Sequence, residues 1–355
     1  MRILKSKYVL MLLCAVGVVL GGCRGNEDEI GEILLTADVQ SVAADGLSKV
    51  KLTATSDGRD VTSQVTFHHT SELFALEGGE FTTVRTGKHK VSASYEGVVS
   101  NEVEIEAVAP ERLPVSRFVR HICVMDFTAT DCAFCPDGQN HMLQVNKQME
   151  DEATACHLMA LHNPGVDPMG IALTSQMMND YKVEEQPYYL IDMRDKGGVN
   201  SNEEKSAYRK CLMRSTDLYP AHVGVAVRTK FNKDNGKSCQ VEVSLLSERN
   251  DHYRVALYVV EDGIVADQNV NGFYKSYTHN HVVRALVNES YRGDNLGAVA
   301  AEQSASKTYS FDMADEWVVE KTSVYVLVMD STGFVNNMAV CPVNNGTADY
   351  DFLEK

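Results

Sequence analysis

Apolar and polar residues alternate in short runs through the first third of the chain. Val50, Leu52 and Ala54 share one side of such a run, and residues 90–95 alternate in the same way. A period of two is typical of strands with one buried face, and glycine-containing turn signals separate the runs. About seven short strands at this spacing predict an all-β sandwich for residues 33–108.

The pattern changes after Pro110 and Pro114, which interrupt any strand or helix and predict a linker over residues 109–116. Beyond it, short apolar runs alternate with segments of helical periodicity. This alternation predicts an α/β domain with a mixed central sheet over residues 117–219. The expected strands are 121–127, 154–161 and a run after Pro187, and the expected helices are 136–152, 171–181 and 202–215.

From residue 220 the pattern returns to period two. Residues 223–230 and 239–246 alternate and are joined through Asn235-Gly236, a strong hairpin signal. Residues 253–260 and 324–329 are expected to be central strands. The chain is therefore predicted to be multidomain, with a C-terminal antiparallel β-sandwich over residues 220–345 and a tail over residues 346–355.

The N-terminus predicts export. A short basic region precedes a run of thirteen apolar or small residues, which fits a signal peptide and is too short for a bilayer core of about 30 Å. The sequence Leu20-Gly21-Gly22-Cys23 resembles the cleavage box of bacterial lipoproteins, in which the cysteine is acylated, for example with palmitate. Residues 1–22 are thus predicted to be a signal peptide and Cys23 a lipid anchor. An ordinary secretory cleavage site and an uncleaved anchor are the alternatives.

Charge restricts the partners. Loss of the three basic residues of the signal peptide lowers the formal net charge from −16 to −19, which disfavours nucleic acid and anionic lipid headgroups. Contact with the membrane is therefore expected through the lipid anchor alone. Residues 23–32 form an acidic linker that resembles the signal sending some lipoproteins to the outer cell surface. A merely solvated linker, on a periplasm-facing protein, is the alternative.

The most specific chemical signal is Cys132-Ala133-Phe134-Cys135, at a predicted strand-to-helix junction. A Cys-x-x-Cys pair in this position predicts a thioredoxin-like redox site. A helix N-terminus stabilises a thiolate at Cys132, and Cys135 then closes a ring disulfide. No cofactor is needed for this chemistry, and none is predicted.

Two other features resemble thioredoxins. Asp126 lies six residues before Cys132 and matches their buried acid, which takes the proton of the second cysteine. Pro187 matches the cis-proline that aligns the substrate backbone. One departure is Asp131, which replaces a tryptophan and whose negative charge is expected to raise the pKa of the Cys132 thiol.

Other readings of these residues remain open. The cysteine pair could be a stabilising disulfide or a remnant of a redox site on a binding protein. A zinc or copper site would need further ligands, for which His157 and His162 are nearest in sequence. The run His279-Asn280-His281 is expected to be a structural loop rather than a metal site. The remaining mature cysteines are expected to be mainly buried thiols: Cys123, Cys156, Cys211, Cys239 and Cys341.

Residues 115–345 together resemble the outer-membrane-protein-28-related lipoproteins of Gram-negative anaerobes. The resemblance includes the Cys132–Cys135 pair, residues 257–265 and Asn336-Asn337. It implies a thioredoxin-like domain, a C-terminal β domain and an outer-membrane, often surface-exposed protein for which adhesion to host molecules has been suggested. Residues 33–108 resemble the immunoglobulin-like domains of bacterial surface adhesins, which serve as stalks or bind partners.

Two functions follow as hypotheses. The first is thiol–disulfide exchange with a protein or peptide, in which Cys132 attacks, Cys135 resolves, Asp126 accepts a proton and Pro187 aligns the substrate. The alternative is a non-enzymatic, surface-exposed binding or adhesion lipoprotein that uses its β domains.

Overall fold

The computed structural model describes residues 31–355, except residues 45–47, 70–74, 77, 84–85, 110–115, 152, 166, 234–236 and 354–355. The predicted signal peptide, the anchor Cys23, most of the linker over residues 109–116 and the Asn235-Gly236 turn therefore lie outside the described residues. None of the helices in the described part of the chain is long and apolar enough to cross a membrane.

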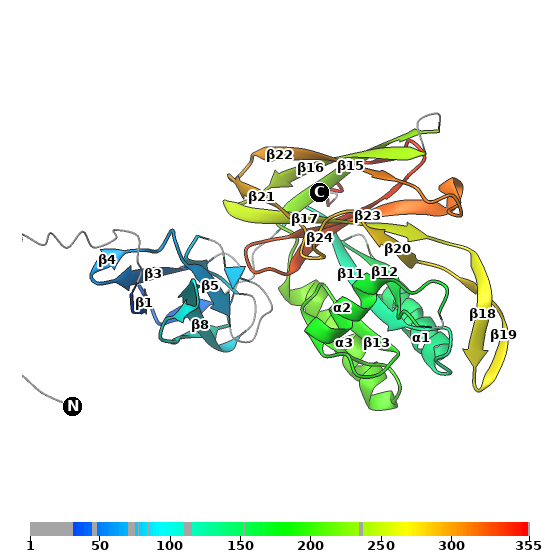
Figure 1. Cartoon of the computed structure of the whole chain (residues 1–355), viewed down its shortest axis with the longest axis horizontal. Helices are drawn as coiled ribbons and strands as arrows, with labels where there is room; N and C mark the ends of the chain where they lie inside the picture. The colour runs from blue at the N-terminus through cyan, green and yellow to red at the C-terminus, as the bar shows by residue number, and fades with distance from the viewer. Residues whose placement is uncertain are drawn as a thin grey trace, which may run out of the picture.

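Residues 33–108 form two small sheets around one apolar core (Figure 1). Val50, Leu52 and Ala54 are fully buried in this core, as their alternation predicts. The first sheet holds β1 (Ile33–Ala37), β3 (Val50–Ser56), β4 (Arg59–Asp60) and β7 (Glu80–Phe81), and the second holds β2 (Ser41–Ala43), β5 (Thr66–His69), β6 (Ala75–Leu76), β8 (Gly87–Tyr95), β9 (Val98–Val99) and β10 (Val103–Val108).

The predicted α/β and C-terminal segments share one nine-stranded sheet, in the order β14-β13-β11-β12-β20-β17-β23-β24, with β21 paired to β17. Ala160 pairs in parallel with Val282, so the sheet is continuous across the boundary expected at residues 219 and 220. Its strands are β11 (Arg120–Thr128), β12 (Thr154–His162), β13 (Tyr188–Ile191), β14 (Asp195–Gly198), β17 (Asp251–Glu261), β20 (Val282–Leu286), β21 (Asp294–Val299), β23 (Thr322–Met329) and β24 (Val335–Pro342).

Three helices cover the α/β half of this sheet: α1 (Cys135–Met149), α2 (Ala172–Tyr181) and α3 (Asn202–Leu218). Alternate residues of β11 point to opposite faces. Val124 packs with Met142 of α1 and Tyr208 of α3, whereas the next residue along β11 packs with the α2 side chains on the other face. The three predicted helices are therefore observed, and they lie on both faces of the sheet.

A second, four-stranded sheet, in the order β22-β16-β15-β25, faces the other half of the large sheet (Figure 1). Val225 and Val243 from it share a core with Leu257 and Val326, so the two-layer β arrangement expected for the C-terminal segment is observed. Its strands are β15 (Val223–Asn232), β16 (Ser238–Ser247), β22 (Ser304–Asp312) and β25 (Thr347–Ala348), and a short 3-10 helix, η1 (Val319–Lys321), precedes β23.

The expected tail is part of the fold. Strand β25 lies within residues 346–355 and pairs with β15. The backbone N–H of Val119 donates to the carbonyl of Asp351 at 3.0 Å, and Phe352 pairs with Phe118. The C-terminus thus fixes the strand that enters the α/β half.

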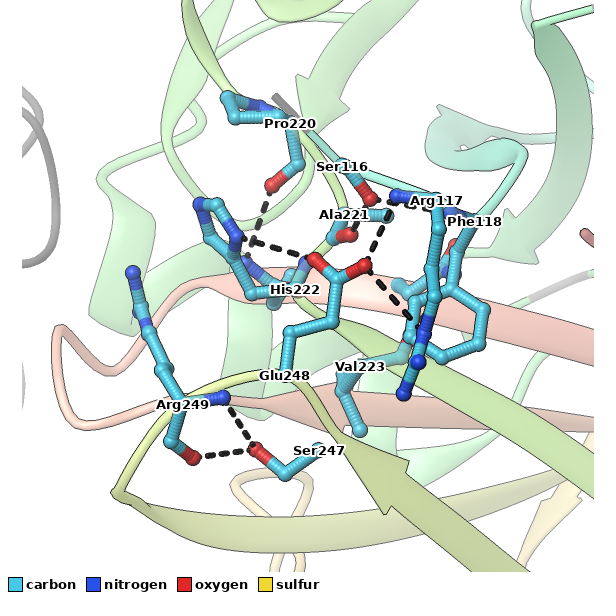
Figure 2. A network of polar contacts seen from close by, with 12 residues as sticks. Ser116, Arg117, Phe118, Pro220, Ala221, His222, Val223, Ser247, Glu248 and Arg249 are labelled. Carbon is cyan, nitrogen blue, oxygen red and sulfur yellow. Dashed lines mark hydrogen bonds and ion pairs between the residues drawn. The ribbon is translucent and has the colours of Figure 1, made fainter. Parts of the chain in front are cut away.

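A polar network joins three segments where the chain enters the α/β half (Figure 2). One Glu248 carboxylate oxygen accepts the backbone N–H of Arg117 at 2.8 Å, and the other lies 3.6 Å from Nδ1 of His222. Ser116 Oγ donates to the carbonyl of Ala221 in the same network. These contacts hold residues 116–118 against the start of β15 and the end of β16.

A separate two-stranded hairpin extends from the C-terminal half along the side of α1 (Figure 1). It consists of β18 (Ile264–Val270) and β19 (Phe273–His279). A two-stranded ribbon has little stability by itself in water, so its contacts with the rest of the molecule hold it in place.

Candidate functional site

The cysteine pair lies in the short connection between the end of β11 and the start of α1. Cys132 and Cys135 form a disulfide with an S–S distance of 2.06 Å and a Cα–Cα distance of 5.4 Å. Cys135 is the first residue of α1 and only 2% exposed, whereas Cys132 lies in the preceding turn and is half-buried. Pro136 occupies the first turn of the helix, where its missing N–H costs no hydrogen bond. The bond is therefore open to a partner at Cys132 and closed at Cys135.

Asp126 is fully buried on β11, the strand that precedes the cysteine pair. Its Oδ2 accepts a hydrogen bond of 3.1 Å from Nε2 of Gln139, which lies one helical turn after Cys135. Its Oδ1 has no partner among the described residues. Burial raises the pKa of Asp126 to about 7, against the opposing effect of the Gln139 hydrogen bond. This carboxyl group can therefore gain or lose a proton near neutral pH.

The peptide bond between Gln186 and Pro187 is cis, and Pro187 lies immediately before β13. The carbonyl oxygen of Gln186 lies 3.6 Å from Sγ of Cys132. On the other side, a Cβ at Gly138 would come within 2.4 Å of Cγ of Pro187, so only glycine lets α1 approach this closely. The structure thus brings Pro187 and both cysteines together.

An aspartate in the connection after β12 fixes the start of the cysteine-containing loop. Oδ2 of Asp167 accepts the backbone N–H of Thr130 at 2.8 Å and lies 2.7 Å from Nδ1 of His162. Burial opposes ionisation of Asp167, but its hydrogen bonds, above all that with His162, keep its pKa below the usual value. His162 is therefore held by a carboxylate.

The other candidate metal ligands also have structural partners. His157 stacks on His121, with 2.9 Å between Nε2 of His157 and Nδ1 of His121. In the next connection, Oδ1 of Asn280 accepts the backbone N–H of Gly263 at 2.9 Å, so residues 279–281 form a hydrogen-bonded loop. Within the described ranges, no group of three or more His, Cys, Asp or Glu side chains could hold a metal ion.

The five other described cysteines are free. Cys123, Cys239 and Cys341 are buried, and Cys156 and Cys211 are partly buried. Burial raises the pKa of the Cys156 thiol to about 12, so that thiol stays protonated. These cysteines pack as small apolar side chains, and none of them bonds to Cys132 or Cys135.

Three residues around the pair were not predicted from the sequence. Gln139 could have been found by its helical spacing, because it lies four residues after Cys135 on the same face of α1. Gln268 and Asn269 of β18 also contact the cysteine-containing loop. They follow Cys132 by more than 130 residues, and no local pattern links them to it.

Residues 174–345 match the family model described as outer membrane protein Omp28. The predicted family resemblance is confirmed over these residues, and the match supports association with the outer membrane. Residues 115–173, which hold Asp126, Cys132 and Cys135, lie before the matched range. No curated protein matches the sequence.

Among solved structures, HBP35 of Porphyromonas gingivalis has a TM-score of 0.53 and 18% identity, over 64% of this chain and 76% of that chain. At this identity the likeness concerns the fold alone. The adhesin InvE of Yersinia pseudotuberculosis covers 90% of this chain and 58% of its own at 11% identity, but its TM-score of 0.19 supports no structural conclusion.

Proposed function

We propose that this chain, whose residues 174–345 match the outer membrane protein Omp28 family, exchanges disulfides with protein or peptide thiols through Cys132 and Cys135. One observation carries the proposal. A half-exposed Cys132 is bonded to a buried Cys135 at the start of a helix, and Gln139 of the same helix holds the buried carboxyl group of Asp126, whose pKa is about 7.

A thioredoxin-like assignment of the α/β half is supported by the order of its elements. Strands β11 and β12 are parallel and β13 is antiparallel to β11. The cysteine pair follows β11 and begins α1, while Pro187 leads into β13 beside it. The helices lie on both faces, and Pro187 stands next to the sulfur that a substrate would reach.

The proposed exchange starts from the disulfide seen here. A substrate thiolate attacks Sγ of Cys132, the Cys132–Cys135 bond breaks, and the electron pair stays on Cys135, which takes a proton from Asp126. A second substrate thiolate then attacks the substrate sulfur of the mixed disulfide and releases Cys132 as a thiolate. The substrate leaves as a disulfide and the protein as a dithiol. The reverse sequence reduces a substrate disulfide, with Asp126 taking the proton of Cys135.

Local electrostatics favour Cys132 as the leaving and attacking sulfur. The helix that begins at Cys135 directs its unpaired N–H groups toward this connection, and such groups stabilise an anion. Asp131 opposes this effect by its negative charge. The thiolate at Cys132 is therefore weaker as a leaving group than it would be beside a neutral residue.

We also propose that Cys23 carries the lipid anchor, that the chain faces the outside of the cell, and that residues 33–108, an immunoglobulin-like domain, space the redox half from the membrane. Labelling with a palmitate analogue should be lost in Cys23→Ala. Proteolysis of intact cells should remove residues beyond the anchor, whereas protection of the chain would place it on the periplasmic side.

Insulin reduction under a dithiol reductant tests the redox function. The wild-type chain should accelerate insulin precipitation, and Cys132→Ser should return the rate to that of the reductant alone. Cys156→Ser is the matched control, because it removes a thiol outside the site. Equal rates for wild type and Cys132→Ser would refute the enzyme and leave the non-enzymatic binding or adhesion protein.

A further inference from the structure

We propose that the β18–β19 hairpin holds the redox loop, defined as residues 129–135, in the conformation that joins the two sulfurs, and that Gln268 is the main positioning residue. This inference rests on the proposed exchange at Cys132 and Cys135. It assigns a role in that exchange to a hairpin from the C-terminal half of the molecule.

Five consecutive backbone carbonyls of the redox loop accept hydrogen bonds from β18 and from the turn that follows it. Nε2 of Gln268 donates to the carbonyls of Ala129 and Cys132, at 3.2 and 3.0 Å. The three carbonyls left between and after them are bonded by neighbouring residues of the hairpin: Asn269 N to Thr130 at 2.7 Å, Asn269 Nδ2 to Asp131 at 3.1 Å and Asn271 N to Ala133 at 3.3 Å.

Gln268 differs from its neighbours in the hairpin by its burial. It is 2% exposed, whereas Val265 and Phe273 are 68% and 79% exposed. A buried amide needs partners for its N–H groups, and those of Gln268 are supplied by the redox loop and by the carbonyl of Asn269 at 3.0 Å. The loop carbonyls therefore satisfy the buried amide of Gln268, and the amide in turn fixes the position of the loop.

The loop is also fixed at its start and on its opposite side. The backbone N–H of Thr130 donates to Asp167, and Gln186 Nε2 donates to the carbonyl of Thr128 at 3.1 Å. The hairpin donates hydrogen bonds to residues 129–133, which include Cys132 and lead to the start of α1. Without the hairpin, the carbonyls of Asp131, Cys132 and Ala133 would lose these hydrogen bonds.

Reduction breaks the S–S bond, but none of these hydrogen bonds involves a sulfur atom, so all of them can form in the dithiol as well. The hairpin should therefore keep Cys132 close to Cys135 in the dithiol and raise the effective concentration of one thiol at the other. If these contacts are weakened, the loop of the dithiol can relax and the two thiols move apart. The equilibrium constant for disulfide formation then falls. The hairpin thus makes the protein a weaker oxidant and a stronger reductant.

The test compares Gln268→Met with the wild-type chain in full length, solubilised in detergent. Methionine has a similar length and no N–H donors. Each protein is equilibrated in glutathione redox buffers, and the oxidised fraction of the pair is counted by thiol alkylation and mass spectrometry. Loss of the two hydrogen bonds from Gln268 frees the dithiol loop, so the effective concentration of one thiol at the other should fall. The equilibrium constant for disulfide formation should fall with it by about tenfold, or ~30 mV for two electrons.

Ser276→Ala is the matched control, because Ser276 is an exposed, neutral residue of β19. Its equilibrium constant should stay within about twofold of wild type, the scatter expected of a surface substitution. A wild-type constant in a folded Gln268→Met chain would overturn the proposal. If that variant does not fold, Asn269→Ala, which removes the side-chain donor to Asp131, should still give a few-fold decrease, and no decrease would overturn it.

The constant is measured without a substrate, which separates the two proposals. A chain that leaves insulin intact but shifts its constant in Gln268→Met supports the positioning role and refutes the proposed activity. A chain that reduces insulin and shows no shift refutes the positioning role alone.

Discussion

Replacement of Asp126 by asparagine should remove a pH dependence of stability that the buried carboxyl group creates. The side chain lies at 0% exposure, and asparagine keeps its shape while removing the titration. Oδ1 of Asp126 has no partner among the described residues, so the ionised form is poorly compensated. The folded protein therefore prefers the protonated acid.

The size of the effect follows from the shift in pKa. Burial raises the pKa of Asp126 from 3.8 to about 7, and a shift of about three units corresponds to ~4 kcal/mol of differential stability. Between these two values the folded chain keeps a proton that the unfolded chain has released. Stability must then fall as the pH rises through this window, and the whole penalty is present above pH 7.

The variant lacks this penalty. Relative to wild type, Asp126→Asn should gain up to ~4 kcal/mol of unfolding free energy between about pH 4 and about pH 8, most of it between about pH 4 and pH 7. Urea denaturation of the oxidised proteins measures this, with fluorescence of Trp317, the single tryptophan, as the probe. A difference between the two proteins that stays constant with pH would refute the reasoning. The same variant should slow disulfide exchange by ~100-fold, since it lacks a proton donor and acceptor.

Three other changes test the surroundings of the site. Gly138→Ala places a methyl group within 2.4 Å of Pro187 and should cost ~1–3 kcal/mol in urea denaturation while slowing exchange; unchanged stability would contradict the close approach. Gln139→Leu removes a hydrogen bond that lowers the pKa of Asp126, so the midpoint of the pH profile of exchange should rise, and a fall would contradict it. Glu248→Ala leaves the backbone N–H of Arg117 and the ring of His222 without their carboxylate and should cost ~1–3 kcal/mol, whereas a neutral effect would show that the network in Figure 2 adds no stability.

Local patterns in the sequence predicted most of the elements. The alternation through Val50, Leu52 and Ala54 corresponds to a strand whose inward side is fully buried. The two runs flanking Asn235-Gly236 pair in antiparallel register from Val223 with Ser247 to Asn232 with Ser238. The expected helix after the cysteine pair begins one residue earlier than predicted, at Cys135. Periodicity finds these elements because each depends on which of its own residues are buried.

The way in which the elements pack together could not be predicted from local periodicity. Pairing of Ala160 with Val282 joins the two halves into one sheet, but both strands are apolar and either would fit an interior position. The contact between Gln268 and the redox loop depends on one hairpin crossing to a segment more than 130 residues away. Such pairings leave no period in the sequence, so the part of the site that comes from the C-terminal half was missed.

Trapping of mixed disulfides in cells tests the central claim most directly. Cys135→Ser removes the resolving thiol and should accumulate covalent complexes with other proteins through Cys132, visible as reductant-sensitive bands and identified by mass spectrometry. Cys132→Ser, which leaves only the buried Cys135 of the pair, should show none of them. Equal complexes in both variants, or none in either, would contradict exchange at Cys132.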